Sequence, residues 1–310
     1  MWLLWLSVGI ALFLLFFSLG AFLIACFRYD AFVANLDKVL TRPIYRDCKQ
    51  EILEGKAYLQ TRPYEEIRIR SHDGLTLVGD FYPCENARGT ILMFHGWRSA
   101  PLMDCGCAAP SYHRNGLNTL LVYQRAQGKS EGKYMTFGIR ERKDVHSWVK
   151  WHADRFGKDA PLLLTGLSMG AASVLMACGE PFEGNVRGVI ADCGFTSPDE
   201  IIKSVIRSAH LPSVPLAPMM NFWAKCLAGF DFKEYSTLTA MPNTHLPIFF
   251  AHGEADSFVP CDMTKKSHAA CASADKTLFL VPEARHGMSY VLAREQYEQH
   301  IRDFIDRTIP

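Results

Sequence analysis

Three side chains in the C-terminal half of the sequence could together carry out nucleophilic catalysis. The stretch LLLTGLSMGAAS places Ser168 between Gly166 and Gly170, where a strand-like apolar run becomes a helix-like run. In this context a sharp strand-to-helix turn can expose a serine hydroxyl as a nucleophile. Serine and glycine both have weak propensity for regular structure, so folding stability alone does not explain them. We therefore predict that Ser168 attacks a carbonyl carbon.

A serine nucleophile needs a base, and the base needs an acid that orients it. His286, in LFLVPEARHGMSY, follows the last strand-like run and is the predicted base. The segment PIFFAHGEADSFVP ends another such run and offers two acids, Glu254 and Asp256. We select Asp256 because it lies further out along the loop. Serine, then acid, then histidine is the chain order of triads whose serine sits on such a strand-to-helix turn, and Ser168, Asp256 and His286 follow this order.

The fourth requirement is a pair of backbone amides that stabilise an oxyanion. ILMFHGW places His95, Gly96 and Trp97 just beyond a strand-like run. The N–H groups of Trp97 and Met169 are the predicted donors, and Gly96 permits the turn. His95 could act as a second base, but its position before the glycine favours a role in shaping the loop.

The elements that must position these residues alternate along the chain. EEIRIRS and LTLVGDFY, separated by a turn, predict an antiparallel hairpin. Continuous apolar runs typical of strands buried on both faces follow in GTILMFHG, NTLLVYQ, PLLLTG, VRGVIADCG, LPIFFAHG and KTLFLVPEA. Helix-like segments lie between them. This alternation predicts an α/β fold with a mostly parallel, doubly wound sheet, in which reactive groups gather at the carboxyl ends of the strands.

The N-terminal segment Trp2–Phe27 contains no charged residue. As a helix its 26 residues would reach about 39 Å, enough to cross a hydrocarbon core of about 30 Å. A cleaved signal peptide is the competing interpretation, but the basic start is missing and the apolar run is too long. A lipoprotein signal ending at Cys26 lacks the basic start too. We expect a retained, single-pass transmembrane helix over residues 1–27.

The charge distribution suggests how this helix is oriented. Arg28, Lys38, Arg42 and Arg46 follow the helix and no basic residue precedes it. The positive-inside rule then places the downstream domain in the cytoplasm. We expect residues 28–62 to form a juxtamembrane connector.

Composition narrows the functional classes. The formal net charge of the 310-residue chain is +1 and no basic stripe occurs, which argues against nucleic-acid binding. The ten cysteines are scattered, and Cys105 and Cys107 are too close together for a usual zinc site. They are expected to be reduced thiols, which agrees with a reducing compartment.

The motifs FHGW, GLSMG, AHGEADSFVP and EARHG together resemble those of the α/β-hydrolase superfamily. YQRAQGKSEGKYMTFGIRERKD and AGFDFKEYS are more narrowly similar to membrane-anchored bacterial esterase- or peptidase-like members. The resemblance covers residues 63–310, the expected hydrolase domain. It departs from the family pattern at Tyr123 and Gln127, in a loop that forms a structural corner. It implies a small helical cap, inserted at about 195–245, over the site.

These features predict a serine hydrolase that cleaves carboxylic esters through an acyl-enzyme intermediate. The chemistry needs no metal and no organic cofactor. The expected partners are a small-molecule or lipid-like ester and a membrane. Thioesterase, acyltransferase and serine peptidase activity on the same triad remain alternatives, as does a non-catalytic membrane-bound binding protein. The apolar side chains of the cap could contact an acyl group or simply pack the cap onto the core.

Overall fold

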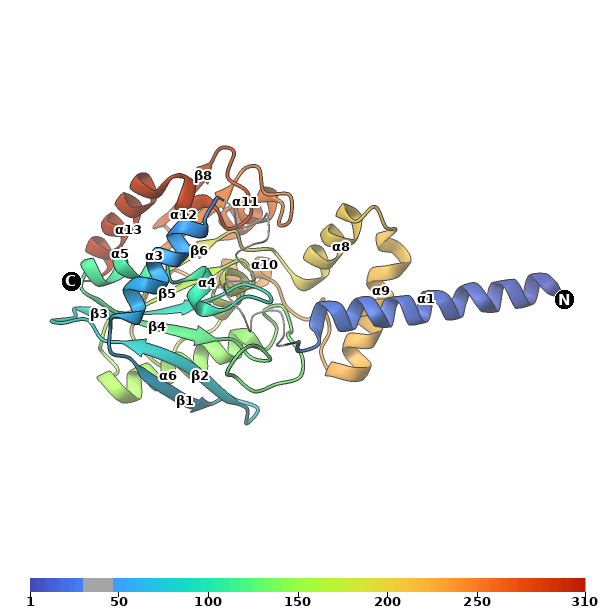
Figure 1. Ribbon diagram of the computed structural model, residues 1–310, viewed down its shortest axis with the longest axis horizontal. Coiled ribbons are helices and arrows are strands. Elements are labelled where there is room, and N and C mark those ends of the chain that lie inside the picture. Colours follow the sequence, from blue (N-terminus) through green and yellow to red (C-terminus); the bar gives the residue numbers. More distant parts are fainter. Residues whose placement is uncertain (30–46, 310) are drawn as a thin grey trace.

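The candidate residues are positioned by one eight-stranded sheet whose strand order differs from the chain order (Figure 1). The computed structural model describes residues 1–29 and 47–309 of the chain. Its strands are β1 (Glu65–Arg70), β2 (Thr76–Tyr82), β3 (Gly89–Phe94), β4 (Leu117–Tyr123), β5 (Leu162–Leu167), β6 (Val186–Asp192), β7 (Ile248–Gly253) and β8 (Lys276–Val281). They lie in the order β1-β2-β4-β3-β5-β6-β7-β8.

The pairing of the strands confirms the predicted fold class. β1, β2 and β4 pair antiparallel, and every pair from β4 to β8 is parallel. The predicted hairpin is β1–β2, and each of the six predicted buried runs is a strand. β3 and β5 are neighbours although β4 lies between them in the chain. This arrangement brings the loops after β3 and β5 side by side.

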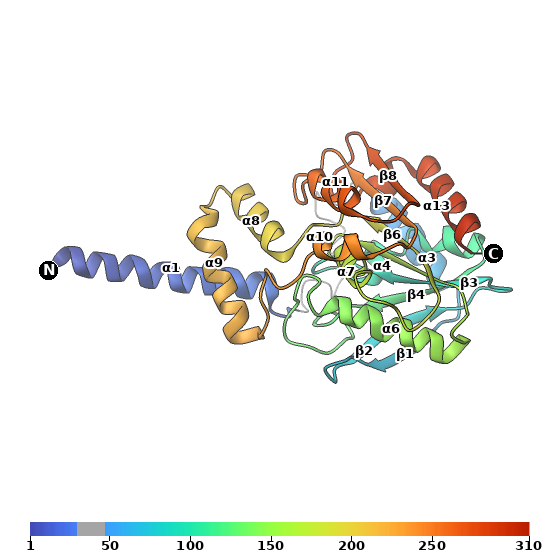
Figure 2. The same cartoon turned by 180° about the vertical axis from the view of Figure 1, so that it is seen from behind.

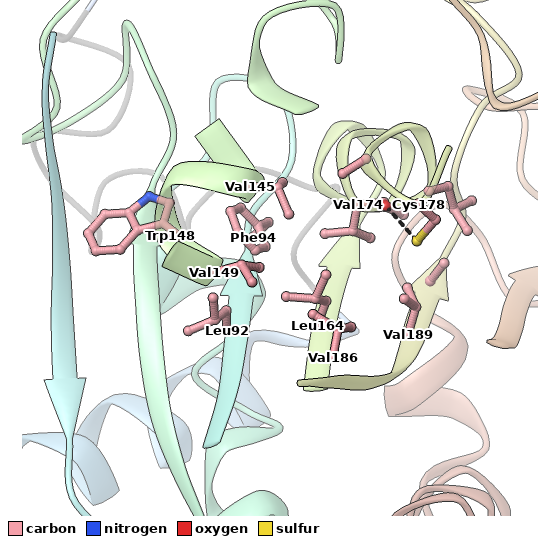
Figure 3. Close-up of a cluster of buried hydrophobic side chains, with 14 of the residues drawn as sticks. Leu92, Phe94, Val145, Trp148, Val149, Leu164, Val174, Cys178, Val186 and Val189 are labelled. Carbon is pink, nitrogen blue, oxygen red and sulfur yellow. Dashed lines mark hydrogen bonds between the residues drawn. The ribbon is translucent and has the colours of Figure 1, made fainter. Parts of the chain in front are cut away.

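Helices cover both faces of the sheet because consecutive strand residues point to opposite sides. On β3, Leu92 and Phe94 pack with α6 (Glu141–Phe156) and α7 (Met169–Ala177), as Figure 3 shows. Ile91 and Met93 pack on the other face with α5 (Ala109–Arg114) and α13 (Arg294–Thr308). In Figures 1 and 2 the strands lie between α6 and α13. The sheet is therefore doubly wound, as predicted.

Shorter helices complete the body. They are α4 (Pro101–Asp104), α10 (Thr237–Ala240), α11 (Cys261–Ala270) and α12 (Ser289–Leu292), with a 3₁₀ turn at Met241–Asn243. The expected connector, 28–62, is only partly described, since 30–46 lies outside the described residues. Its C-terminal part forms α3 (Lys49–Gln60), which buries Ile52 and Leu59 against the body. That packed helix is a feature that the sequence did not predict.

The N-terminal segment forms one helix, α1 (Trp2–Cys26). It is long and apolar enough to cross a membrane, and most of it stands free of the body (Figures 1 and 2). Only Ser18, Phe22 and Cys26 of this helix are buried. They recur every four residues and therefore share one face of the helix.

The cap consists of α8 (Pro198–Ser208), α9 (Ser213–Trp223) and the π-helical segment η3 (Ala224–Ala228). Its buried side chains, among them Ile202, Leu216 and Met220, pack with Phe22 of α1 and Met176 of α7 in one cluster. In both ribbon views α8 and α9 stand outside the sheet beside α1. The apolar cap residues thus mainly pack the cap between α1 and the body.

The ten cysteines are all free thiols, in agreement with the prediction. The corner loop after β4 is held by Arg125, which is buried and pairs with Asp73 and Asp144. At the departure from the family pattern, the Tyr123 hydroxyl donates to Asp80 over 2.9 Å. The corner is therefore anchored by polar contacts at Tyr123 and Arg125, whereas the side-chain amide of Gln127, the second departure, is buried without a hydrogen-bond partner among the described residues.

Candidate active site

The predicted site residues follow four different strands and meet at one edge of the sheet. Ser168 follows β5, Trp97 follows β3, Asp256 follows β7 and His286 follows β8. All but Asp256 line the same cavity, and Asp256 contacts His286 directly. The structure therefore brings together the five residues that the sequence singled out, with Met169 adjacent to Ser168 in the chain.

Ser168 occupies a backbone conformation that few non-glycine residues adopt. Its φ is +56° and its ψ is −113°, between the last residue of β5 and the first residue of α7. The flanking glycines make this turn possible. A Cβ on Gly166 would lie 2.3 Å from the carbonyl carbon of Gly170, and a Cβ on Gly170 would lie 2.0 Å from the Phe94 oxygen. Strained backbone of this kind is concentrated at functional sites.

Ser168, His286 and Asp256 form a continuous hydrogen-bonded chain. The Ser168 hydroxyl lies 3.0 Å from His286 Nε2, and His286 Nδ1 lies 2.6 Å from Asp256 Oδ2. A proton on Nδ1 would be donated to the carboxylate, which leaves Nε2 free to accept the serine proton. The tautomer that this geometry favours is the one required of a general base.

Asp256 is held as a buried carboxylate. Its Oδ1 accepts the amides of Phe258 and Val259 at 2.8 and 2.9 Å. Burial alone would raise the pKa of this carboxyl, but hydrogen bonds from His252 and His286 outweigh that effect and hold the pKa well below its ordinary value. Glu254, the other acid considered from the sequence, is instead exposed and lies 3.5 Å from Lys265.

His252 is a positioning residue that the sequence did not indicate. It is fully buried at the end of β7, and its Nε2 lies 3.1 Å from Asp256 Oδ2 and 3.0 Å from the Val259 oxygen. Nε2 faces two acceptors and therefore carries a proton. The only sequence signal was its spacing of four residues from Asp256, which is too common to be informative.

The loop after β3 lies directly against Ser168. A Cβ on Gly96 would lie 3.3 Å from Ser168 Cβ. Met169 is the first residue of α7, so its N–H has no acceptor one turn earlier in that helix. The two predicted donors thus belong to segments next to the serine: Trp97 follows Gly96 in the loop after β3, and Met169 follows Ser168 in the chain. His95 is fully buried, with Nδ1 2.8 Å from the Gly96 oxygen and Nε2 accepting the Gln124 amide, contacts that fit a role in shaping the loop.

Asp104 fixes the loop after β3. The sequence did not indicate this role of Asp104. Its Oδ2 accepts the Gly96 amide at 2.6 Å, and its Oδ1 accepts the Ser99 hydroxyl at 2.6 Å. Charge-assisted hydrogen bonds of this length are strong and directional. Asp104 therefore holds the chain on both sides of Trp97, at the Gly96 amide and at the Ser99 hydroxyl.

Replacing Asp104 with leucine should lower kcat for the expected ester hydrolysis about 10- to 100-fold, because the Trp97 amide, the predicted oxyanion donor, is displaced. Asp104→Asn keeps an acceptor for the Gly96 amide and should retain most of the activity. Steady-state kinetics of both variants, with thermal unfolding as a check on folding, measure the effect. Equal kcat values for the leucine variant and the unaltered protein would remove Asp104 from this role.

A cavity of about 320 Å³ opens beside Ser168. Its apolar lining comes from Ile52, Met103, Leu167, Phe258, Met288 and Val291. Among the described residues, none of the lining residues belongs to the cap segment 195–245. The expectation of a cap over the site therefore needs correction, because α3 and the loops after β7 and β8 enclose this cavity instead.

One group at the site could in principle hold a metal ion. Ligand atoms of Cys193, Asp256 and His286 lie within 4.8 Å of one another. Burial, however, raises the pKa of the Cys193 thiol well above its ordinary value, so the thiolate that a metal requires is disfavoured. Both ring nitrogens of His286 already face Ser168 and Asp256. The donor set suits nucleophilic catalysis better than metal binding.

Comparison with known proteins agrees with this architecture. The family model described as the prolyl oligopeptidase family (Peptidase_S9) matches residues 131–310. YqkD of Bacillus subtilis is 29% identical over 192 residues, 62% of this chain and 63% of YqkD. The thiohydrolase AneE of Aspergillus aculeatus is 27% identical over 159 residues, 50% of this chain and 47% of AneE. The chain thus covers less than two thirds of either relative.

A solved structure shares the fold. The esterase Pf2001 of Pyrococcus furiosus superposes with a TM-score of 0.68 and 21% identity, over 82% of this chain and 94% of Pf2001. At this identity the likeness concerns the fold alone. The family match covers more than half of the chain, and together with the sheet topology it leads to one conclusion: the chain belongs to the prolyl oligopeptidase family and is an α/β-hydrolase superfamily serine hydrolase.

Proposed function

We propose that this hydrolase cleaves carboxylic esters through an acyl-enzyme intermediate formed on Ser168. The observation that carries the proposal is the hydrogen-bonded chain from Ser168 through His286 to Asp256, built on a serine with a positive φ. Each residue has the contacts that its role requires. The serine faces a base, and the base faces a buried carboxylate.

In the first half of the reaction, Ser168 Oγ attacks the ester carbonyl carbon and its proton passes to His286 Nε2. Asp256 stabilises the imidazolium that forms. The negative charge that develops on the carbonyl oxygen is stabilised by the amides of Trp97 and Met169. The tetrahedral intermediate collapses, the bond from carbon to the alcohol oxygen breaks, and the leaving alkoxide takes the proton from His286.

In the second half, water enters where the alcohol left. His286 removes a proton from that water as it attacks the acyl carbon, and the same amides stabilise the second oxyanion. Collapse breaks the bond to Ser168 Oγ, which recovers its proton from His286. The acid is released and the site returns to its starting state.

Esters are preferred to peptides in this proposal because the cavity beside Ser168 has a largely apolar lining suited to an acyl chain. The solved neighbour is named an esterase and AneE a thiohydrolase, which supports acyl transfer from oxygen or sulfur. The family name suggests peptide bonds as the main alternative. A tight apolar site could also favour transfer to an alcohol rather than to water.

A fluorophosphonate probe tests the nucleophile, and a substrate panel tests the class. The detergent-solubilised protein should gain one adduct, located on Ser168 by peptide mass spectrometry and missing in Ser168→Ala. Turnover of p-nitrophenyl butyrate should exceed that of butyryl-thiocholine and of a prolyl p-nitroanilide. An adduct on another residue, or faster cleavage of the anilide, would contradict the assignment.

We also propose that α1 anchors the enzyme as a single-pass helix. Its span from Trp2 to Cys26 is apolar and largely exposed, as a lipid-facing helix should be. Arg28, Lys38, Arg42 and Arg46 follow the helix closely, which favours a cytoplasmic catalytic domain. The ten free cysteines agree with the cytoplasm, because it is a reducing compartment in which thiols stay unpaired.

A further inference from the structure

The end of α1 is fixed to the loop that carries the proposed oxyanion donor. Trp97 Nε1 donates to the Ala25 oxygen over 2.7 Å, and Arg98 Nη2 donates to the oxygens of Ile24 and Phe27 over 2.6 and 2.8 Å. These acceptors are the carbonyls that a helix leaves unpaired at its C-terminus. An anchor alone would not need such contacts, which join α1 and the loop after β3 into one hydrogen-bonded unit.

The charge that follows α1 indicates the depth of this unit in a bilayer. A hydrocarbon core of about 30 Å takes about 20 helical residues, and α1 has 25. Arg28 directly follows the apolar run, so the last turn of α1 is expected to lie in the interface. Trp97 contacts that turn, which places the mouth of the active site at the level of the lipid headgroups.

The cap contacts the same helix further from its C-terminal end. Trp223 of α9 donates to the Ser18 hydroxyl over 3.1 Å. The cap nevertheless leaves Val214, Phe222 and Leu227 exposed by 72, 53 and 44%. Apolar side chains gathered at one end of a molecule mark a contact surface. Figures 1 and 2 show α9, which carries Val214 and Phe222, beside α1, and this position favours lipid as the occupant of the surface.

An apolar groove lies next to the active-site cavity. The groove, of about 420 Å³, is lined by Leu23, Ile24, Phe27, Tyr29, Trp97 and Arg98. Among the described residues, only Trp97 and Arg98 also line the cavity beside Ser168, so these two side chains stand between the two cavities.

A series of ring contacts leads from Trp97 to His286, the proposed base. The Trp97 ring stacks on Phe258 with centroids 6.4 Å apart, and Phe258 meets the His286 ring at 5.0 Å. A long acyl chain could therefore lie on α1 while its carboxyl end reaches Ser168.

We propose that α1 forms part of the acyl-binding site and that the substrates are long-chain esters that enter from the bilayer. The inference rests on the proposed serine hydrolase function and adds the substrate class and its route. The groove accepts the acyl chain at the interface, and the ester group moves past Trp97 to the nucleophile without crossing water.

The groove is tested with the full-length protein in phosphatidylcholine vesicles. Ile24 is 70% exposed and lines the groove, so Ile24→Trp fills it. Ile10, 52% exposed on the same helix and outside the groove, provides the matched control Ile10→Trp. The readout is kcat/KM for p-nitrophenyl palmitate divided by that for p-nitrophenyl acetate. We expect Ile24→Trp to lower this ratio at least about tenfold, Ile10→Trp to leave it unchanged, and Ile24→Leu to retain it.

The route is tested by diluting the palmitate ester with phosphatidylcholine. Rates should follow the mole fraction of ester in the bilayer rather than its bulk concentration. An unchanged ratio in Ile24→Trp, with Ser168 still labelled by fluorophosphonate, would overturn the groove while leaving the proposed function intact. Rates that follow bulk concentration would overturn entry from the bilayer. Absence of all turnover and labelling in the unaltered protein would instead overturn the proposed function on which the inference rests.

Discussion

Ser168→Ala is expected to lower kcat for ester hydrolysis by about 10⁴-fold or more, because it removes the atom that bonds to the acyl group. Ser173→Ala is the matched control. That serine is buried in α7, the helix that Ser168 precedes, and its hydroxyl lies 2.7 Å from the Met169 oxygen and 3.4 Å from Gln124 Oε1. The control should retain kcat within about twofold, since it loses only hydrogen bonds of modest value. Steady-state assays of purified variants with matched melting curves measure both.

The same mechanism predicts that the losses of kcat caused by replacing Ser168 and by replacing His286 are not additive. His286→Ala should be nearly as damaging as Ser168→Ala, and the double variant should be no worse than either single variant, because the two groups act as one unit. If the fold-loss of kcat in the double variant equalled the product of the two single losses, the two residues would act independently. That outcome would contradict the hydrogen-bonded chain as the source of nucleophilicity, whatever the single-variant rates.

The parts of this molecule that were predictable share one physical property. Each buried strand is a continuous apolar run, and each predicted site residue follows such a run. In a parallel sheet these positions converge. Ser168 carried an additional signal, because Gly166 and Gly170 are needed where α7 approaches the strands too closely for any Cβ. Local sequence therefore encoded both the sheet and the meeting point.

The unpredicted parts depend on contacts between distant segments. His252 and Asp104 act through hydrogen bonds to a carboxylate and to a backbone amide, and neither partner leaves a pattern in the sequence. In α1, the docking face of Ser18, Phe22 and Cys26 is hidden because the helix is apolar on every side. An amphipathic pattern would have revealed the face, but a helix that is apolar all round shows none.

The cap illustrates how the same residues allowed two interpretations. Its apolar side chains fit either a substrate cavity or a packing surface, and composition does not distinguish these uses. The structure resolves the ambiguity for Met220, which is buried with Phe22 of α1. The cavity beside Ser168 is closed instead by segments such as α3, whose mixed charged and apolar sequence gave no sign of packing.

Asp256→Asn is expected to lower kcat by about 10³- to 10⁴-fold while leaving the protein folded at neutral pH. The asparagine oxygen can still accept the amides of Phe258 and Val259. Its NH₂ group would then face His286 Nδ1, so the imidazole must place its proton on Nε2. In that tautomer His286 cannot accept the Ser168 proton. Glu254→Gln, two residues earlier on the exposed side of the loop, is the control and should keep kcat unchanged; a comparable loss there would contradict the choice of acid.

The same substitution should also alter acid stability. Because the pKa of Asp256 is depressed in the folded state, its carboxylate stabilises that state at pH values above the unfolded pKa of about 3.9. The contribution is lost as pH falls through the unfolded and then the folded pKa. Urea unfolding at a series of pH values should therefore show a shallower fall in stability below about pH 4 for Asp256→Asn than for the unaltered protein. Parallel curves would mean that the His252 and His286 contacts do not hold the carboxylate in its charged form, and the tautomer argument would lose its basis.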